Sequence, residues 1–204
     1  MRELPEMPTR RALLLLPLAA AACGKPDPAY VPPWPMRFGH LIPLPLNVAA
    51  IEVAPGSPPT QLGDIGARLL PSPAEAVRIM GQDRLIAVGT AGEARFIVSQ
   101  AAMIQGRDSL TCLVGCRLEI LSAEGQRVGF VEAQARTAVS GSDSTRPRAA
   151  EALLRDAMDK LNVEFEFHAR QTLKDWLVKV TPGPDGTLPA APPAGVTTEE
   201  LPRG

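Results

Sequence analysis

The chain has 204 residues, of which 45% are hydrophobic, and its 21 basic and 22 acidic residues give a net charge of −1. This length allows one domain with a buried core, together with further segments at its ends. The balanced charge argues against nucleic acid or an anionic lipid surface as the main partner, because both require clustered cations.

The most informative segment lies near the N-terminus, where residues 10–23 read Arg-Arg-Ala-Leu-Leu-Leu-Leu-Pro-Leu-Ala-Ala-Ala-Ala-Cys. Two cations, a short apolar run and small residues follow one another in the order of a secretory signal. The run is too short to span a bilayer, which requires ~20 apolar residues, and Pro17 would disturb a buried core helix. We therefore predict that residues 1–22 are a signal peptide. Met7 is an alternative start of translation, and a start there would remove two acidic residues, Glu3 and Glu6, from the signal peptide.

The end of this run resembles the lipobox of bacterial lipoproteins, whose cysteine thiol receives a diacylglycerol and becomes the first residue of the mature chain. Cys23 stands in the place of that cysteine, Ala21, Ala22 and Gly24 fit the positions around it, and Ala20 stands where leucine is usual. The resemblance implies a protein held in a membrane by acyl chains on Cys23. Gly24 is compatible with the periplasmic side of the outer membrane, and the inner membrane is the alternative.

Prolines mark the limits of the expected domain, since they are concentrated between residues 26 and 59 and between residues 182 and 202. Proline fixes φ and lacks an N–H, so such stretches resist helices and central strands. We predict a lipid-anchored, proline-rich tether over residues 23–45, a folded domain over residues 46–180 and a disordered tail over residues 181–204.

The folded segment is expected to begin with a strand over residues 46–53, ended by a Pro-Gly pair. The sequence Ser72-Pro-Ala-Glu then matches a capping box with proline at the first helical position, which predicts a helix beginning there. Apolar residues at spacings of three and four continue this helix, and Gly89 is expected to close it. Gly81 in its middle costs ~1 kcal/mol relative to alanine, which indicates a close approach between this helix and a sheet.

Alternating apolar and polar residues predict three further strands, over residues 94–103, 110–121 and 128–139. The last element is predicted as a helix from about residue 145 to residue 177. Residues 163–167 alternate with period two and leave a strand as the alternative there, although strong helix formers flank them. The element order β-α-β-β-β-α predicts an α+β fold, with two helices packed on one face of a four-stranded, mostly antiparallel sheet.

Cys112 and Cys116 lie four residues apart on one predicted strand, a separation of ~13 Å. A disulfide joins α-carbons ~4.4–6.8 Å apart, so a bond between them would require a bend in this strand. We interpret both as small buried core residues, with the disulfide as a disfavoured alternative. A metal site is a third reading. It is disfavoured because neither His40 nor His168 has another ligand at a usable spacing.

Motifs typical of catalysis are missing from the sequence: there is no nucleophile elbow, Walker loop, HExxH or dinucleotide fingerprint. Residues 140–144 carry three serines and an aspartate, and we interpret them as a loop and a helix cap. The acidic side chains of the last helix are interpreted as its solvated side; they are Asp156, Asp159, Glu164 and Glu166. The sequence therefore predicts no catalytic residue, no metal ligand and no cofactor.

Three stretches resemble small uncharacterised lipoproteins of Gram-negative bacteria: Pro45-Leu-Asn-Val-Ala-Ala-Ile-Glu-Val, Ser72-Pro-Ala-Glu with Asp83-Arg-Leu, and Glu93-Ala-Arg-Phe-Ile-Val. The element order is also similar to that of ABC-type transport auxiliary lipoproteins. These resemblances imply a non-catalytic accessory or binding component of the cell envelope, with a protein or lipid partner. The alternatives are a carrier of a hydrophobic ligand between sheet and helices, and a carboxylate-dependent envelope hydrolase.

Overall fold

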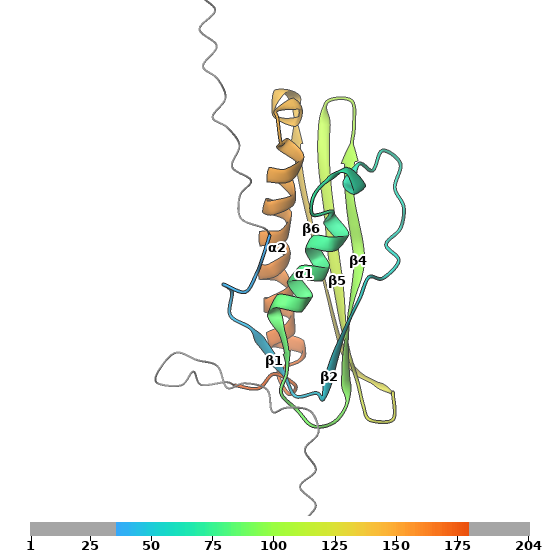
Figure 1. Cartoon of the computed structure of the whole chain (residues 1–204), viewed down its shortest axis with the longest axis vertical. Coiled ribbons are helices and arrows are strands. Elements are labelled where there is room, and N and C mark those ends of the chain that lie inside the picture. Colours follow the sequence, from blue (N-terminus) through green and yellow to red (C-terminus); the bar gives the residue numbers. More distant parts are fainter. Residues whose placement is uncertain (1–35, 180–204) are drawn as a thin grey trace, which may run out of the picture. The chain divides into compact units, whose positions relative to one another are not determined.

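The structure is a computed structural model that describes residues 36–179. Its strands and helices follow in the order β1, β2, α1, β3, β4, β5, β6 and α2, with short 3₁₀ helices η1 (Gly66–Arg68) and η2 (Gly141–Thr145). Helices α1 (Pro73–Arg84) and α2 (Ala149–Thr172) lie on one face of the main sheet, as Figure 1 shows. The predicted α+β fold is confirmed.

The main sheet has four strands in the order β2 (Ala50–Ala54), β4 (Glu93–Gln105), β5 (Ser109–Leu121) and β6 (Arg127–Ser140). β2 pairs with β4 in parallel, whereas β4–β5 and β5–β6 are antiparallel. The three long strands confirm the sequence prediction to within two residues at each end. This agreement follows from their alternating pattern, which is typical of strands with one buried face and is broken in β4 by a register shift between Val98 and Gln100.

Small residues on the inner face of β6 allow α2 to pack closely on it. The buried residues of this strand are Val131, Ala133, Ala135 and Thr137, and those between them are exposed. The Thr137 hydroxyl donates a hydrogen bond of 3.3 Å to the Leu153 carbonyl of α2, so that its polar group is satisfied inside the core.

The structure divides the single strand predicted over residues 46–53 into two. β1 (Leu44–Leu46) pairs in parallel with β3 (Leu85–Ala87) in a small second sheet, while β2 joins the main sheet. Because the two strands have different partners, the chain must turn between them. Val48 lies in this turn, where its N–H donates to the Leu46 carbonyl at 2.8 Å.

The N-terminus of α1 confirms the predicted capping box, since the Ser72 hydroxyl accepts a hydrogen bond of 3.2 Å from the Glu75 N–H. The predicted end of this helix at Gly89 is wrong: the helix ends at Arg84, because the next residues are extended and pair with β1 as strand β3. A Cβ on Gly81 would lie 2.6 Å from Cδ1 of Phe96 on β4. The predicted close approach of helix and sheet is therefore confirmed.

Helix α2 begins later than predicted because residues 141–145 form the 3₁₀ helix η2, and Arg148 precedes α2 with a φ of 66°. The strand alternative for residues 163–167 is wrong, since these residues lie within α2. Helical spacing of four brings Leu161, Phe165 and Ala169 into the core. The Phe165 ring meets the Phe96 ring edge-on, with centroids 5.7 Å apart, and the two rings fill the space between helix and sheet at this point.

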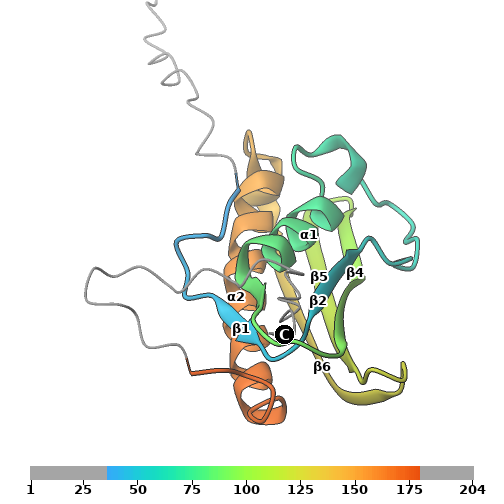
Figure 2. The ribbon, with the colours of Figure 1, turned by 60° about the horizontal axis from the view of Figure 1, so that its bottom comes forward.

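Buried side chains precede residue 46, where the domain was expected to begin. Met36 and Phe38 are both part of the core, and Figure 2 shows their segment running beside α2 toward β1. The predicted signal peptide, Cys23, most of the tether and the tail lie outside the described residues. Within residues 36–179, no helix is both long enough and apolar enough to cross a bilayer.

Candidate functional site

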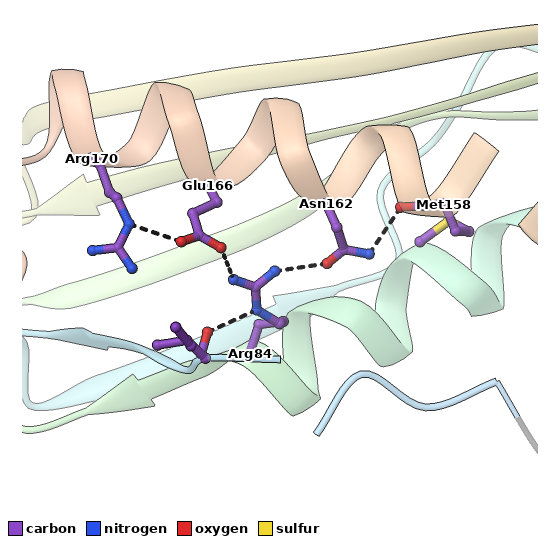
Figure 3. A network of polar contacts seen from close by, with 6 residues as sticks. Arg84, Met158, Asn162, Glu166 and Arg170 are labelled. Atoms are coloured by element: carbon purple, nitrogen blue, oxygen red, sulfur yellow. Dashed lines mark hydrogen bonds and ion pairs between the residues drawn. The ribbon is translucent and has the colours of Figure 1, made fainter. Parts of the chain in front are cut away.

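A buried arginine connects both helices with the segment that precedes β1 (Figure 3). Arg84, the last residue of α1, has a side chain that is only 1% exposed. Its Nε donates to the Ile42 carbonyl at 3.1 Å, its Nη1 to Asn162 Oδ1 at 2.9 Å, and its Nη2 to Glu166 Oε2 at 2.6 Å. The other carboxylate oxygen of Glu166 accepts from Arg170 Nε at 2.9 Å. The network thus joins three separate parts of the fold.

The charges of this network favour an ionised Glu166. Burial by itself raises the pKa of this carboxyl, but the hydrogen bonds and positive charges of Arg84 and Arg170 outweigh burial and hold the pKa below its usual value of 4.5. The carboxylate therefore neutralises the buried guanidinium at neutral pH. The interpretation of Glu166 as part of the solvated side of the helix is wrong, because its side chain is 31% exposed and binds a buried partner.

The helical pattern contained a signal for Arg84 that the sequence analysis missed. Arg84 follows Val77 by seven residues and Met80 by four, and both of these are buried. These spacings place Arg84 on the buried face of α1, where a cation requires an acid and further acceptors. Such a position predicts a partner on a neighbouring element, although the sequence does not say which one.

A second ion pair holds the N-terminal segment on α1. The Asp83 carboxylate, with a side chain only 6% exposed, accepts from Arg37 Nε at 2.9 Å and from Arg37 Nη2 at 2.8 Å. It also accepts from the backbone N–H of Phe38 at 2.7 Å. These contacts, together with the burial of Phe38, explain why the packed domain begins before residue 46.

A pocket of about 440 Å³ lies between this N-terminal segment and α2. Apolar and charged side chains line it together: Met36, Arg37, Phe38, His40, Arg155, Met158 and Asp159. No described residue forms an ion pair with Arg155. Apolar walls, with the cation Arg155 and the acid Asp159 beside them, suit a ligand that has an apolar part and a charged group. This pocket was not predicted from the sequence, because one of its walls comes from residues assigned to the tether.

The two cysteines of the domain lie on β5, where both are fully buried and their thiols are free. Burial, with a smaller effect of the Asp64 charge, raises the pKa of Cys112 to about 12. Burial also raises the pKa of Cys116, with a smaller effect of Glu132. Both thiols are therefore protonated at neutral pH, a state that suits core residues and not nucleophiles.

The two histidines lie in different surroundings. His40 is exposed at the rim of the pocket, and His168 is half-exposed on α2, with its Nε2 3.4 Å from Glu164 Oε2. His168 is thus a boundary residue of α2. Between residues 36 and 179, no group of three or more His, Cys, Asp or Glu side chains could hold a metal ion.

The face of the main sheet opposite the helices carries rows of paired charges. Arg95 Nε binds Glu52 Oε2 at 2.7 Å across β4 and β2, and Arg127 Nη1 binds Glu119 Oε1 at 3.2 Å across β6 and β5. Phe130 of β6 is 48% exposed on this face, and the Arg127 guanidinium lies 5.2 Å from the centre of its ring. Among residues 36–179, neither helix covers this surface, which leaves it available to a partner.

Comparison with known proteins finds matches among solved structures and none among family models or curated proteins. Among solved structures, the chain is similar to the crystal structure of a "putative lipoprotein" from Caulobacter crescentus CB15, with 15% identity over 58% of this chain and 83% of that one. The TM-score is 0.27, so the likeness carries no argument about function.

Proposed function

We propose that this chain is a lipid-anchored lipoprotein of the cell envelope, whose α+β domain acts as a non-catalytic binding component on the periplasmic side of the outer membrane. The observation that carries the proposal is the segment of residues 10–23, with two cations, a short apolar run, small residues and then Cys23. Residues 24–35 separate that cysteine from the first described residue of the domain. This order fits an acylated anchor followed by a folded module.

A binding role is consistent with the structural roles of the polar groups in the described residues. The side chains of Arg84 and Glu166 hold α1 and α2 together, and the thiols of Cys112 and Cys116 are buried and protonated. Two surfaces are open to a partner: the sheet face opposite the helices and the pocket beside α2. An envelope protein would bind to the sheet face, and an amphipathic molecule would bind in the pocket.

Metabolic labelling with a fatty-acid analogue, followed by membrane fractionation, tests the anchor. We expect the wild-type chain to carry label and to sediment with membranes. Cys23→Ala should lose the label, whereas the matched control Cys112→Ala should keep it, because Cys112 is buried in the domain. Label that persists in Cys23→Ala would contradict the assignment of the anchor.

A second candidate function is supported by the pocket, whose volume of about 440 Å³ lies in the range of small-molecule sites. The chain would then carry an amphipathic anion, with its apolar part against Met36 and Met158 and its charge at Arg155. This place differs from the space between sheet and helices considered in the sequence analysis.

Binding of a fluorescent fatty acid with a free carboxylate tests the carrier function on the full chain. Arg155→Glu should weaken binding about tenfold or more, because it replaces an attractive charge by a repulsive one. Lys174→Glu, an equal change of charge on an exposed residue outside the pocket lining, should leave binding unchanged. Equal affinities of wild type and Arg155→Glu would exclude this use of the pocket.

A further inference from the structure

Strand β6 is the longest of the described strands and lies at the edge of the main sheet. Among the described residues its backbone pairs with β5 alone, so the outward N–H and C=O groups have no strand partner there. Soluble proteins usually protect such edges with proline, charged side chains (above all lysine), short strands, bulges, or a covering helix or loop. β6 contains neither proline nor lysine, and its register is irregular only near its start, opposite Leu121.

The exposed side chains of β6 form a charge pattern with an internal symmetry. Glu132 and Arg136 lie on the open face of the sheet, at equal distances along the strand from Gln134. Arg136 forms no ion pair with any described residue, and Glu132 has a contact of 3.4 Å with Arg117. A two-fold rotation about Gln134 exchanges the acidic and the basic position, so the strand is complementary to itself.

We propose that two copies of this chain associate through antiparallel pairing of their β6 strands, with Gln134 opposite Gln134 of the second copy. This register aligns residues 128–140 of one copy with the same residues of the other. It also places Glu132 of each copy opposite Arg136 of the other. Directly opposite side chains have Cβ atoms ~4.5–5.5 Å apart, which is close enough for ion pairs.

Other registers lose this complementarity. A displacement by two residues places Glu132 opposite Gln134 in one direction and opposite Ala138 in the other, and neither residue is charged. The proposed register also sets Phe130 opposite Ala138 of the second copy, where the small side chain leaves room for the half-exposed ring. The charges thus select a register that also pairs nearly the whole length of the strand.

The pairing would join the two four-stranded sheets into one continuous sheet, with all four helices on the same face. Isologous contacts of this kind close on themselves and yield dimers rather than fibres. The proposal is independent of the lipid anchor, because all its residues lie between 128 and 140.

A charge exchange tests the contact most sharply. The protein is the full chain carrying Cys23→Ala, so that acyl groups do not cluster the molecules, and the readout is the dimer dissociation constant from sedimentation velocity. Arg136→Glu places like charges opposite each other and should raise this constant about tenfold or more. The double variant Glu132→Arg/Arg136→Glu restores opposite charges and should regain the dimer.

Arg95→Glu is the matched control, since it breaks an ion pair on the same sheet face but lies on β4, away from the edge. It should leave the dissociation constant unchanged. A Cys23→Ala chain without further changes that stays monomeric throughout the concentration series would overturn the proposal. So would a double variant that dissociates as readily as Arg136→Glu.

A cysteine cross-link tests the register. Residues opposite each other in an antiparallel pair have α-carbons ~4.5–5.5 Å apart, within the range of a disulfide. Gln134→Cys in the Cys23→Ala chain should therefore form a covalent dimer under mild oxidation, while Gln171→Cys, an exposed position on α2, should not. The native Cys112 and Cys116 are buried and do not compete. Absence of the covalent dimer in Gln134→Cys, or equal cross-linking of Gln171→Cys, would refute the proposed pairing.

Discussion

The buried ion pair between Arg84 and Glu166 predicts that removing its acid costs more stability than removing its base. Glu166→Gln leaves the buried Arg84 guanidinium without an anion. Loss of one partner of a buried pair costs ~3–5 kcal/mol, mainly because the remaining charge is uncompensated. Glu166 is partly open to solvent, so we expect the lower end of this range, about 3 kcal/mol of unfolding free energy.

Arg84→Met removes the buried charge itself. The Ile42 carbonyl and Asn162 Oδ1 then lose a donor, while Glu166 retains Arg170 and water. An unsatisfied buried acceptor costs ~1–3 kcal/mol, and partial access of water leads us to expect about 2 kcal/mol in total. The double variant Arg84→Met/Glu166→Gln contains no buried charge, so it should be about as stable as Arg84→Met alone.

Urea unfolding of the full chain, followed by far-UV circular dichroism, measures these differences. The result that supports the reasoning is a rescue, in which adding Arg84→Met to Glu166→Gln raises the unfolding free energy. Arg170→Ala serves as a control and should change stability by less than about 1 kcal/mol, because its ion pair is exposed. A double variant destabilised by the sum of both single changes, about 5 kcal/mol, would refute the coupling.

Three further predictions concern pH, packing and thiol reactivity. The pKa of Glu166 is lower in the folded chain than its usual value of 4.5, so its stabilising contribution is present above that pH and is lost as the pH falls through the folded pKa. The unfolding free energy of the wild type should therefore decline more steeply below pH 4.5 than that of Glu166→Gln. Urea titrations at a series of pH values measure this difference. Gly81→Ala should destabilise the chain by about 1 kcal/mol, since contact with the Phe96 ring outweighs the gain in helix propensity, and a higher urea midpoint would contradict this. Cys112 and Cys116 should resist iodoacetamide at pH 8 in the native chain and react in guanidinium, as counted by mass spectrometry, whereas fast native labelling would show that the strand opens.

Local sequence patterns predicted correctly those elements that interactions between neighbouring residues determine. The capping box at Ser72 depends on four consecutive residues, and alternation runs along β5 and β6 and along β4 up to its register shift between Val98 and Gln100. Residues 163–167 show the limit of this approach. Their period of two was overridden by the helical residues on both sides and by burial of Phe165 in the core.

Contacts between distant residues explain what the sequence analysis missed. The strand expected over residues 46–53 divides because β1 finds its partner in β3, and α1 ends at Arg84 for the same reason. The segment before residue 46 resembles a tether in its composition, yet Phe38 is buried and Asp83 binds its backbone. Such pairings depend on which surfaces meet in three dimensions, and no local pattern encodes them.

The mass of the mature chain purified from membranes tests the central claim most directly. The account predicts a polypeptide that begins at Cys23, and an N-terminal peptide whose mass exceeds that of its sequence by a thioether-linked diacylglycerol. It also predicts that Cys112 and Cys116 carry no such addition. An unmodified Cys23 on a chain that remains in the soluble fraction would contradict the account.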